Sequence, residues 1–239
     1  MSDGNLTGGN QTIVLGSCRF PVTSGTGGTD VTFGRFLTVV VTTVPLPNLS
    51  YLQFEGGPNK ESMFRCQGDL MKREHTTNND GMFSILSAFN AMGLALGMAT
   101  PRRKYISVPD WLPELTKMGG ASLGLATLVA LLGYIVPDNV AVTGFVTTFG
   151  SSETGMQPLR MLPVDGVDHV GVKARGALDT GVSLLYPMAN EADVVRAMIG
   201  YMRVNRPYET TPVILAVSNI GEVMDWLHAR GCRSRFVDS

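Results

Sequence analysis

One serine in a glycine-rich turn is the first residue of this chain that could do chemistry. Ser122 lies in the stretch Gly119-Gly120-Ala121-Ser122-Leu123-Gly124, and an apolar run typical of a helix begins directly after it. Glycines let a backbone approach a substrate closely, and the free N–H groups at a helix start can bind a developing oxyanion. The turn therefore suits nucleophilic attack on a carbonyl. The alternative interpretation is a small residue at a packed helix start.

A serine nucleophile needs a base, and one lysine lies in apolar surroundings. Lys173 follows Val170-Gly171-Val172 at the start of a helix predicted over 173–180. Burial, the positive end of the helix dipole and the neighbouring Arg175 would all penalise the charged amine and lower its pKa. A neutral lysine can accept the proton of a serine hydroxyl. The alternative is a lysine whose ammonium reaches solvent from a small surface helix.

A Ser–His–Asp arrangement fits the sequence less well. The letters around Ser122 match G-x-S-x-G, but that elbow needs a strand leading straight into the turn. Here the segment 111–118, with Pro113, separates the turn from the preceding predicted strand. The histidines available as a base for this alternative are His75, His169 and His228.

Cysteines and histidines are too scattered to predict a metal site. The three cysteines are Cys18, Cys66 and Cys232, and no CxxC pair exists. Cys66 is the alternative nucleophile, although no histidine has a suggestive spacing from it. The sequence also lacks the G-x-x-x-x-G-K-[ST] loop of ATP-hydrolysing proteins. We therefore expect neither a metal nor a cofactor, and the small odd cysteine count fits a reducing compartment.

The elements that position these residues form a predicted α+β domain with about five helices. Asn79 and Asp80 are good N-caps, Gly181 and Gly231 are typical helix ends, and Asn219 with Glu222 resembles a capping box. Helices are expected from about 80 to 94, over 122–132, 173–180 and 191–202, and from 219 to 231. Strands are expected over 12–15, 36–44, 51–54, 104–108, 140–149 with a break at 143–144, 182–186 and 213–217.

The domain organisation follows from composition. We expect residues 1–35 to be a flexible segment with one strand, residues 36–232 to be the folded domain, and residues 233–239 to be a tail. Residues 150–172 read as an inserted loop, either a substrate-facing flap or an inert surface loop. The apolar run 121–136 is shorter than the roughly 20 residues that a membrane span needs, so we interpret it as a buried helix.

The overall charge excludes two classes of partner. The net charge is −1 and charged residues make up 16% of the chain, which gives no electrostatic reason to expect nucleic acid or an anionic membrane. The N-terminus is polar and lacks the pattern of a signal peptide. We therefore expect a cytoplasmic protein.

Several segments, in order, resemble the proteolytic domain of the Lon protease family. Residues 120–124 are similar to its Gly-Pro-Ser-Ala-Gly nucleophile motif, residues 67–74 to its Gly-Asp-Val-Met-Lys-Glu segment, and residues 140–144 to its Val-Ala-Met-Thr-Gly strand. Lys173 precedes Gly181 by the family's offset. The closing segments 190–193 and 217–223 resemble Asn-Glu-x-Asp and Val-Ser-x-x-x-Glu-Val.

The resemblance implies a single Lon-protease-like domain with short mixed sheets and a Ser122–Lys173 catalytic dyad. It further implies that the hydroxyl of Thr143 orients the lysine, and that the backbone N–H groups of Ser122 and Ala121 form the oxyanion hole. Birnavirus polyprotein proteases share this fold and also lack an ATPase. The expected function is thus an ATP-independent serine endopeptidase, a viral one in the host cytoplasm, which cuts unfolded or linker segments, its own polyprotein included.

The chain also departs from the family pattern. Ala121 replaces the usual proline and Leu123 the usual alanine, and the separation of Ser122 from Lys173 is longer than usual. These departures keep an alternative open, a catalytically inactive Lon-like module that acts in protein–protein interaction.

Overall fold

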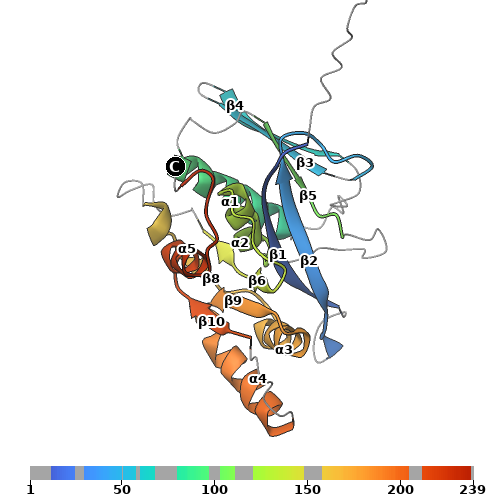
Figure 1. Ribbon diagram of the computed structural model, residues 1–239, viewed down its shortest axis with the longest axis vertical. Helices are drawn as coiled ribbons and strands as arrows, with labels where there is room; N and C mark the ends of the chain where they lie inside the picture. Colours follow the sequence, from blue (N-terminus) through green and yellow to red (C-terminus); the bar gives the residue numbers. More distant parts are fainter. Residues whose placement is uncertain are drawn as a thin grey trace, which may run out of the picture.

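Two long neighbouring strands, β1 (Val14–Ser24) and β2 (Thr32–Thr42), form the centre of a mixed sheet. The computed structural model describes residues 12–24, 30–49, 51–57, 60–67, 80–96, 103–110, 121–147, 158–204 and 212–237. The other strands of this sheet are β3 (Tyr51–Gly57), β4 (Lys60–Gln67), β5 (Arg103–Ser107), β6 (Val140–Val142), β9 (Ser183–Pro187) and β10 (Ile214–Val217). Their order is β10-β9-β6-β1-β2-β5-β3-β4, from the bottom to the top of Figure 1.

The sheet is antiparallel in one half and parallel in the other. β2 pairs antiparallel with β1 and β5, and β3 pairs antiparallel with β4 and β5. On the other side of β1, the pairs β1–β6, β6–β9 and β9–β10 are parallel. A separate two-stranded sheet joins β7 (Phe145–Val146) to β8 (Val164–Asp165). Together with the helices, this mixed sheet confirms the predicted α+β class.

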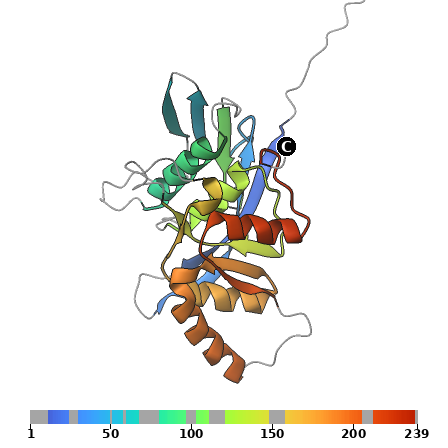
Figure 2. The same cartoon turned by 90° about the vertical axis from the view of Figure 1, so that its left-hand side faces the viewer.

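Five α-helices lie in the described part of the chain and cover both faces of the parallel half. They are α1 (Asp80–Leu96), α2 (Leu123–Leu131), α3 (Val170–Thr180), α4 (Glu191–Val204) and α5 (Ile220–Ala229). Side chains alternate along a strand, so Val140 and Val142 belong to the core shared with α1, α2 and α5, whereas Ala141 belongs to a second core shared with α3 and α4. Figures 1 and 2 show α3 and α4 at the lower end of the molecule, beside β9 and β10.

Helix α2 is apolar on all sides because it is enclosed on all sides. All nine of its residues are buried, as the interpretation of 121–136 as a buried helix predicts. Within the described residues, no helix is long and apolar enough to cross a membrane.

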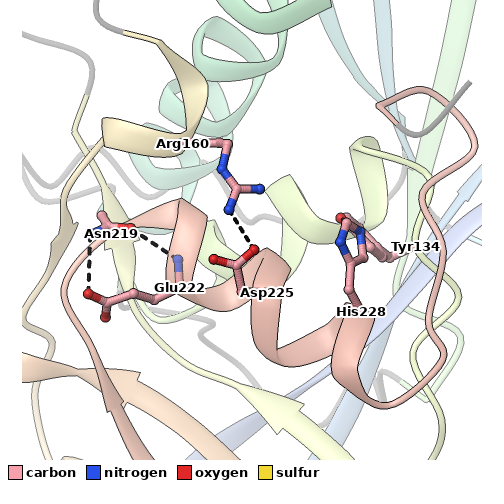
Figure 3. Close-up of polar contacts among 6 residues, drawn as sticks. All are labelled: Tyr134, Arg160, Asn219, Glu222, Asp225 and His228. Atoms are coloured by element: carbon pink, nitrogen blue, oxygen red, sulfur yellow. Dashed lines mark hydrogen bonds and ion pairs between the residues drawn. The ribbon is translucent and has the colours of Figure 1, made fainter.

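Several predicted boundaries are confirmed by local geometry. Helix α1 begins at Asp80, and the predicted break between strands falls at Thr143-Gly144, where Gly144 has φ 153°. Gly181 closes α3 with φ 70°. At the start of α5, the side chain of Asn219 accepts a hydrogen bond from the N–H of Glu222, as the capping-box pattern predicts (Figure 3).

The N-terminal region differs from the prediction. The expected strand at 12–15 is an eleven-residue strand, β1, that pairs with β2 on one side and β6 on the other. Its inward residues include Cys18 and Phe20, but Gly16 and Ser17 obscure the apolar alternation. Residues 14–24 therefore belong to the sheet, and not to a flexible segment. Of the expected flexible segment 1–35, residues 1–11 and 25–29 lie outside the described residues.

The predicted insert, 150–172, is docked wherever it is described. From residue 158 onward it contains a short helix, η4 (Leu159–Met161), and strand β8. Leu162 and Val164 belong to the core, and Arg160 donates to Asp225 of α5 at 2.5 Å (Figure 3). This part of the segment is thus not an inert loop.

The predicted tail at 233–239 also packs on the domain as far as residue 237. The hydroxyl of Ser234 donates to the carbonyl of Leu132 at 2.5 Å, and Phe236 and Val237 pack against the core. The ordered part of the domain therefore extends beyond the predicted end at residue 232.

Candidate active site

The carboxyl ends of β6, β9 and β10 meet at one edge of the sheet, because the three strands are parallel neighbours. Helix α3 leads into β9 through the two-residue connection 181–182, so it runs back along β9 and begins at this edge. Helix α5 follows β10 directly and begins there as well. In open sheets of this kind, ligands bind in the crevice outside the carboxyl ends of the strands.

Ser122 reaches this edge as the N-cap of α2. The N–H of Leu125, in the first turn of α2, donates to the carbonyl of Gly144 at 3.0 Å. That bond ties the helix start to the residue after Thr143. The side chain of Ser122 makes no capping hydrogen bond and is half-buried, so its hydroxyl is not engaged in holding the helix. The glycines at 119–120 lie outside the described residues.

Close packing fixes the start of α2 against α1. A Cβ on Gly124 would lie 3.0 Å from the Cβ of Ser84 and 3.2 Å from its carbonyl oxygen. A larger residue would therefore push the helix start away. The glycine two residues after the serine has a packing role here, besides its resemblance to the family motif.

Lys173 lies in the first turn of α3 and is almost fully buried. Helix α3 begins at Val170, three residues earlier than the sequence predicts, so Lys173 is its fourth residue. The side chain is 4% exposed, and Nζ donates to the carbonyl oxygen of Asp168 at 2.8 Å. Burial lowers the pKa of Lys173 to about 8, with the carboxylate of Asp168 acting in the opposite direction. The predicted contribution of Arg175 is not found, since its side chain is exposed.

Thr143 is fully buried at the end of β6. Its N–H donates to the carbonyl of Leu185 at 3.0 Å, which continues the ladder between β6 and β9. By strand alternation, Thr143 shares the face of Ala141, the face that α3 covers. Its hydroxyl has no hydrogen-bond partner. The predicted hydrogen bond between Thr143 and Lys173 is thus absent, because Nζ donates to the carbonyl of Asp168 instead.

These three positions give the edge a defined chemical capacity. It combines a hydroxyl at a helix start, a buried amine whose pKa lies near neutrality, and a buried threonine hydroxyl without a partner. The starts of α2 and α3 lie at this edge on opposite faces of the sheet. The amine of Lys173 donates to the carbonyl of Asp168 and not to Ser122. A buried amine of this kind can act as a base, and free N–H groups at a helix start can bind negative charge.

The alternative histidine bases are placed differently. The ring Nε2 of His228 lies 2.8 Å from the hydroxyl of Tyr134 (Figure 3). Tyr134 follows the C-terminal end of α2, the end opposite Ser122. His169 is exposed at the start of α3. His75 lies outside the described residues, and the side chain of Cys66 lies outside the described side chains.

Two positions carry contacts that the sequence reasoning did not assign. Asn190 and Asp193 lie in a segment that resembles a family motif, and both hydrogen-bond to the backbone of the turn that leads into α3. The signal was the motif itself, whose polar residues directly follow a predicted strand. Among the described residues, no group of three or more metal-ligating side chains exists.

Comparisons with known proteins add no further information about the site. No family model matches the chain, and no curated protein matches its sequence.

Proposed function

We propose that this protein is an ATP-independent serine endopeptidase in which Ser122 is the nucleophile and Lys173 is the general base. The observation that carries the proposal is the burial of Lys173 at the start of α3, beside the sheet edge where Ser122 also lies. A buried amine with a pKa of about 8 is partly neutral at physiological pH. Lys104 on β5 is equally buried and its pKa is also lowered to about 8, so the burial of Lys173 supports the proposal only together with its place at the sheet edge.

The proposed reaction uses groups of this chain alone. The neutral amine of Lys173 takes the proton of the Ser122 hydroxyl as Oγ attacks the substrate carbonyl carbon. The backbone N–H groups of Ser122 and Ala121 bind the oxygen that becomes negative. When the C–N bond breaks, the leaving amine takes the proton from Lys173. Water, deprotonated by the neutral amine of Lys173, then attacks the acyl carbon. The ester C–O bond to Ser122 breaks, and Lys173 returns the proton to Oγ of Ser122.

Thr143 has a proposed role in orienting the base. Its hydroxyl lies on the face that α3 covers and has no partner. A shift of Nζ from the carbonyl of Asp168 to Thr143 would satisfy this hydroxyl and direct the amine toward the strand end.

The substrate class follows from what the sequence lacks. Without an ATP-binding loop the chain has no motor for unfolding proteins, so it should cut flexible, unfolded or linker segments. Processing of a viral polyprotein in the cytoplasm of a host cell is the context that the resemblance to birnavirus proteases favours. The test of the enzyme itself does not depend on that context.

The proposal is tested by incubating the purified chain with unfolded casein and a peptide library, without nucleotide. Ser122→Ala should abolish cleavage and keep the fold, because one half-buried hydroxyl contributes little to stability. Ser218→Ala, at the end of β10 on the same edge, is the matched control and should cleave normally. Cleavage by a folded Ser122→Ala protein would remove this serine from the mechanism.

A second readout separates an enzyme of unknown specificity from an inactive module. A peptide boronate or another electrophilic serine reagent should label Ser122 in the parent and in Ser218→Ala, and should not label Ser122→Ala. No labelling at any pH up to 10, together with no cleavage, would favour the non-catalytic module.

A further inference from the structure

The turn that leads into α3, residues 167–171, which includes the first two residues of the helix, is held by two side chains from the segment that follows β9. Asn190, the last residue of the short helix η5 (Met188–Asn190), accepts from the N–H of Val167 at 3.0 Å and donates to its carbonyl at 2.9 Å. Asp193, in the first turn of α4, accepts from the N–H of Gly171 at 2.8 Å. Both ends of the turn are thus fastened to one neighbouring segment.

The backbone of this turn needs such support. His169 has φ 60° and ψ 30°, a left-handed conformation that non-glycine residues adopt only when their surroundings impose it. Glycines on either side let the two side chains come close. A Cβ on Gly166 would lie 3.3 Å from Oδ1 of Asn190, and a Cβ on Gly171 would lie 3.1 Å from Oδ2 of Asp193.

This turn also fixes the backbone and the amine of Lys173. The N–H of Lys173 donates to the carbonyl of His169 at 3.1 Å, and its Nζ donates to the carbonyl of Asp168 at 2.8 Å. The two carbonyls are consecutive, and both lie between the residues that Asn190 and Asp193 hold. A loosened turn would move the backbone of the base and the acceptor of its amine together.

We infer that Asn190 and Asp193 are positioning residues that keep the amine of Lys173 in its water-poor position at the sheet edge. The inference rests on the proposed function in assigning Lys173 as the base. In this role Asp193 is a hydrogen-bond acceptor. The amide oxygen of an asparagine can therefore take its place. Loss of either acceptor opens the turn, admits water to the amine and restores the ordinary affinity of the amine for a proton.

Other charges around Lys173 do not account for its state. The titratable groups on the elements around it are Asp168 and His169 in the turn, Arg175 and Asp179 on α3, Tyr186 on β9, Cys18 and Arg19 on β1, Arg35 on β2, and Glu191, Asp193, Arg196, Tyr201 and Arg203 on α4. Among those of these groups whose side chains the structure describes, the carboxylate of Asp168 alone contributes to the pKa of Lys173, and burial is the larger cause. Removing the charge of Asp193 while keeping its oxygen should therefore leave this pKa unchanged.

The test is an NMR titration of lysine side chains labelled with ¹³C at Cε, made in a Ser122→Ala background. The chain has only five lysines, at positions 60, 72, 104, 117 and 173, and Lys173→Arg identifies the signal of interest. Three variants are compared, namely Asp193→Ala, Asp193→Asn and Asn190→Ala. Asp179→Ala is the control, because Asp179 is an exposed carboxylate at the far end of α3.

The expected result is a pKa of about 8 for Lys173 in the parent, in Asp193→Asn and in Asp179→Ala. In Asp193→Ala and Asn190→Ala it should rise by about one unit or more. The same two variants with Ser122 intact should lose about tenfold in kcat/KM at pH 7, since the neutral fraction of the base falls tenfold. They should regain the loss at high pH.

Folded alanine variants with an unchanged pKa at Lys173 would overturn the inference. An equal change in Asp193→Asn and Asp193→Ala would overturn it as well, because the aspartate would then act through its charge. If Asp193→Ala does not fold, Asn190→Ala decides the question from the other end of the turn. The titration needs no proteolysis, so it reports on the turn even if the protein proves not to be a protease.

Discussion

Replacing Lys173 by methionine should make the protein more stable at neutral pH while it removes the proposed activity. The pKa of the buried amine lies at about 8, against an ordinary 10.5, and one pKa unit is worth about 1.4 kcal/mol. The protonated lysine therefore costs the folded state on the order of 3 kcal/mol at pH 7. Methionine fills a similar volume without a charge, so most of this cost should be recovered.

The pH dependence gives this prediction its sign. Below pH 8 the amine is protonated in both states and the full cost is present. Between about pH 8 and 10.5 the unfolded chain binds the proton and the folded chain does not, so the stability of the parent rises with pH. Above pH 10.5 both states are neutral and the cost is gone. The advantage of Lys173→Met should thus shrink as the pH rises from 8 to 10.5.

Urea unfolding followed by tryptophan fluorescence, to which the buried Trp226 contributes, measures the difference at pH 7 and pH 10. Lys104→Met is the matched control, because Lys104 is also buried and its pKa is also lowered to about 8 by burial. The control should gain a similar stability and should keep its proteolytic activity. A Lys173→Met protein that is less stable than the parent at pH 7 would refute the assignment of a destabilising buried amine.

Two further predictions concern the reaction, and one concerns its requirements. The kcat/KM should rise with pH through a single ionisation near 8, and Lys173→Arg should be inactive because a guanidinium keeps its proton in this range. A bell-shaped profile centred near ~6.5 would point instead to a histidine such as His169. Thr143→Val should lower kcat on the order of 10-fold without lowering the unfolding free energy, since its hydroxyl has no partner to lose; equal kcat would make the hydroxyl idle. Cleavage should be unaffected by a chelator or by ATP, and a dependence on either would contradict the proposed chemistry.

The sequence predicts the elements around the site well, because their ends carry strong local signals. Gly181 at the end of α3 and the Asn219–Glu222 cap at the start of α5 are short-range patterns whose geometry does not depend on the rest of the chain. The buried nature of α2 is equally local, since no helix so uniformly apolar can face water. These signals place Ser122 and Lys173 on helix starts without any knowledge of the sheet.

The contacts that define the site are not local, and the sequence does not give them. The acceptor of the Lys173 amine is a backbone carbonyl in a left-handed turn, and no side-chain pattern marks a carbonyl. Helix α3 begins at Val170 and not at Lys173, because Asp193 of another helix satisfies the N–H of Gly171. The length of β1 is hidden for a related reason, since its pairing on both sides compensates for its small and polar residues.

Two unfavourable polar groups of the described core, the amine of Lys173 and the hydroxyl of Thr143, are found at the same edge of the sheet. Burial of the charged amine of Lys173 lowers the stability of the folded protein. A buried hydroxyl without a partner, such as that of Thr143, costs about 1–3 kcal/mol. A chain under selection for stability alone would replace both by apolar residues of similar size. Local conflicts of this kind are expected where function opposes stability. If Lys173→Met and Thr143→Val stabilise the protein singly and together, while the first abolishes cleavage and the second lowers it, this edge is kept for chemistry and not for the fold.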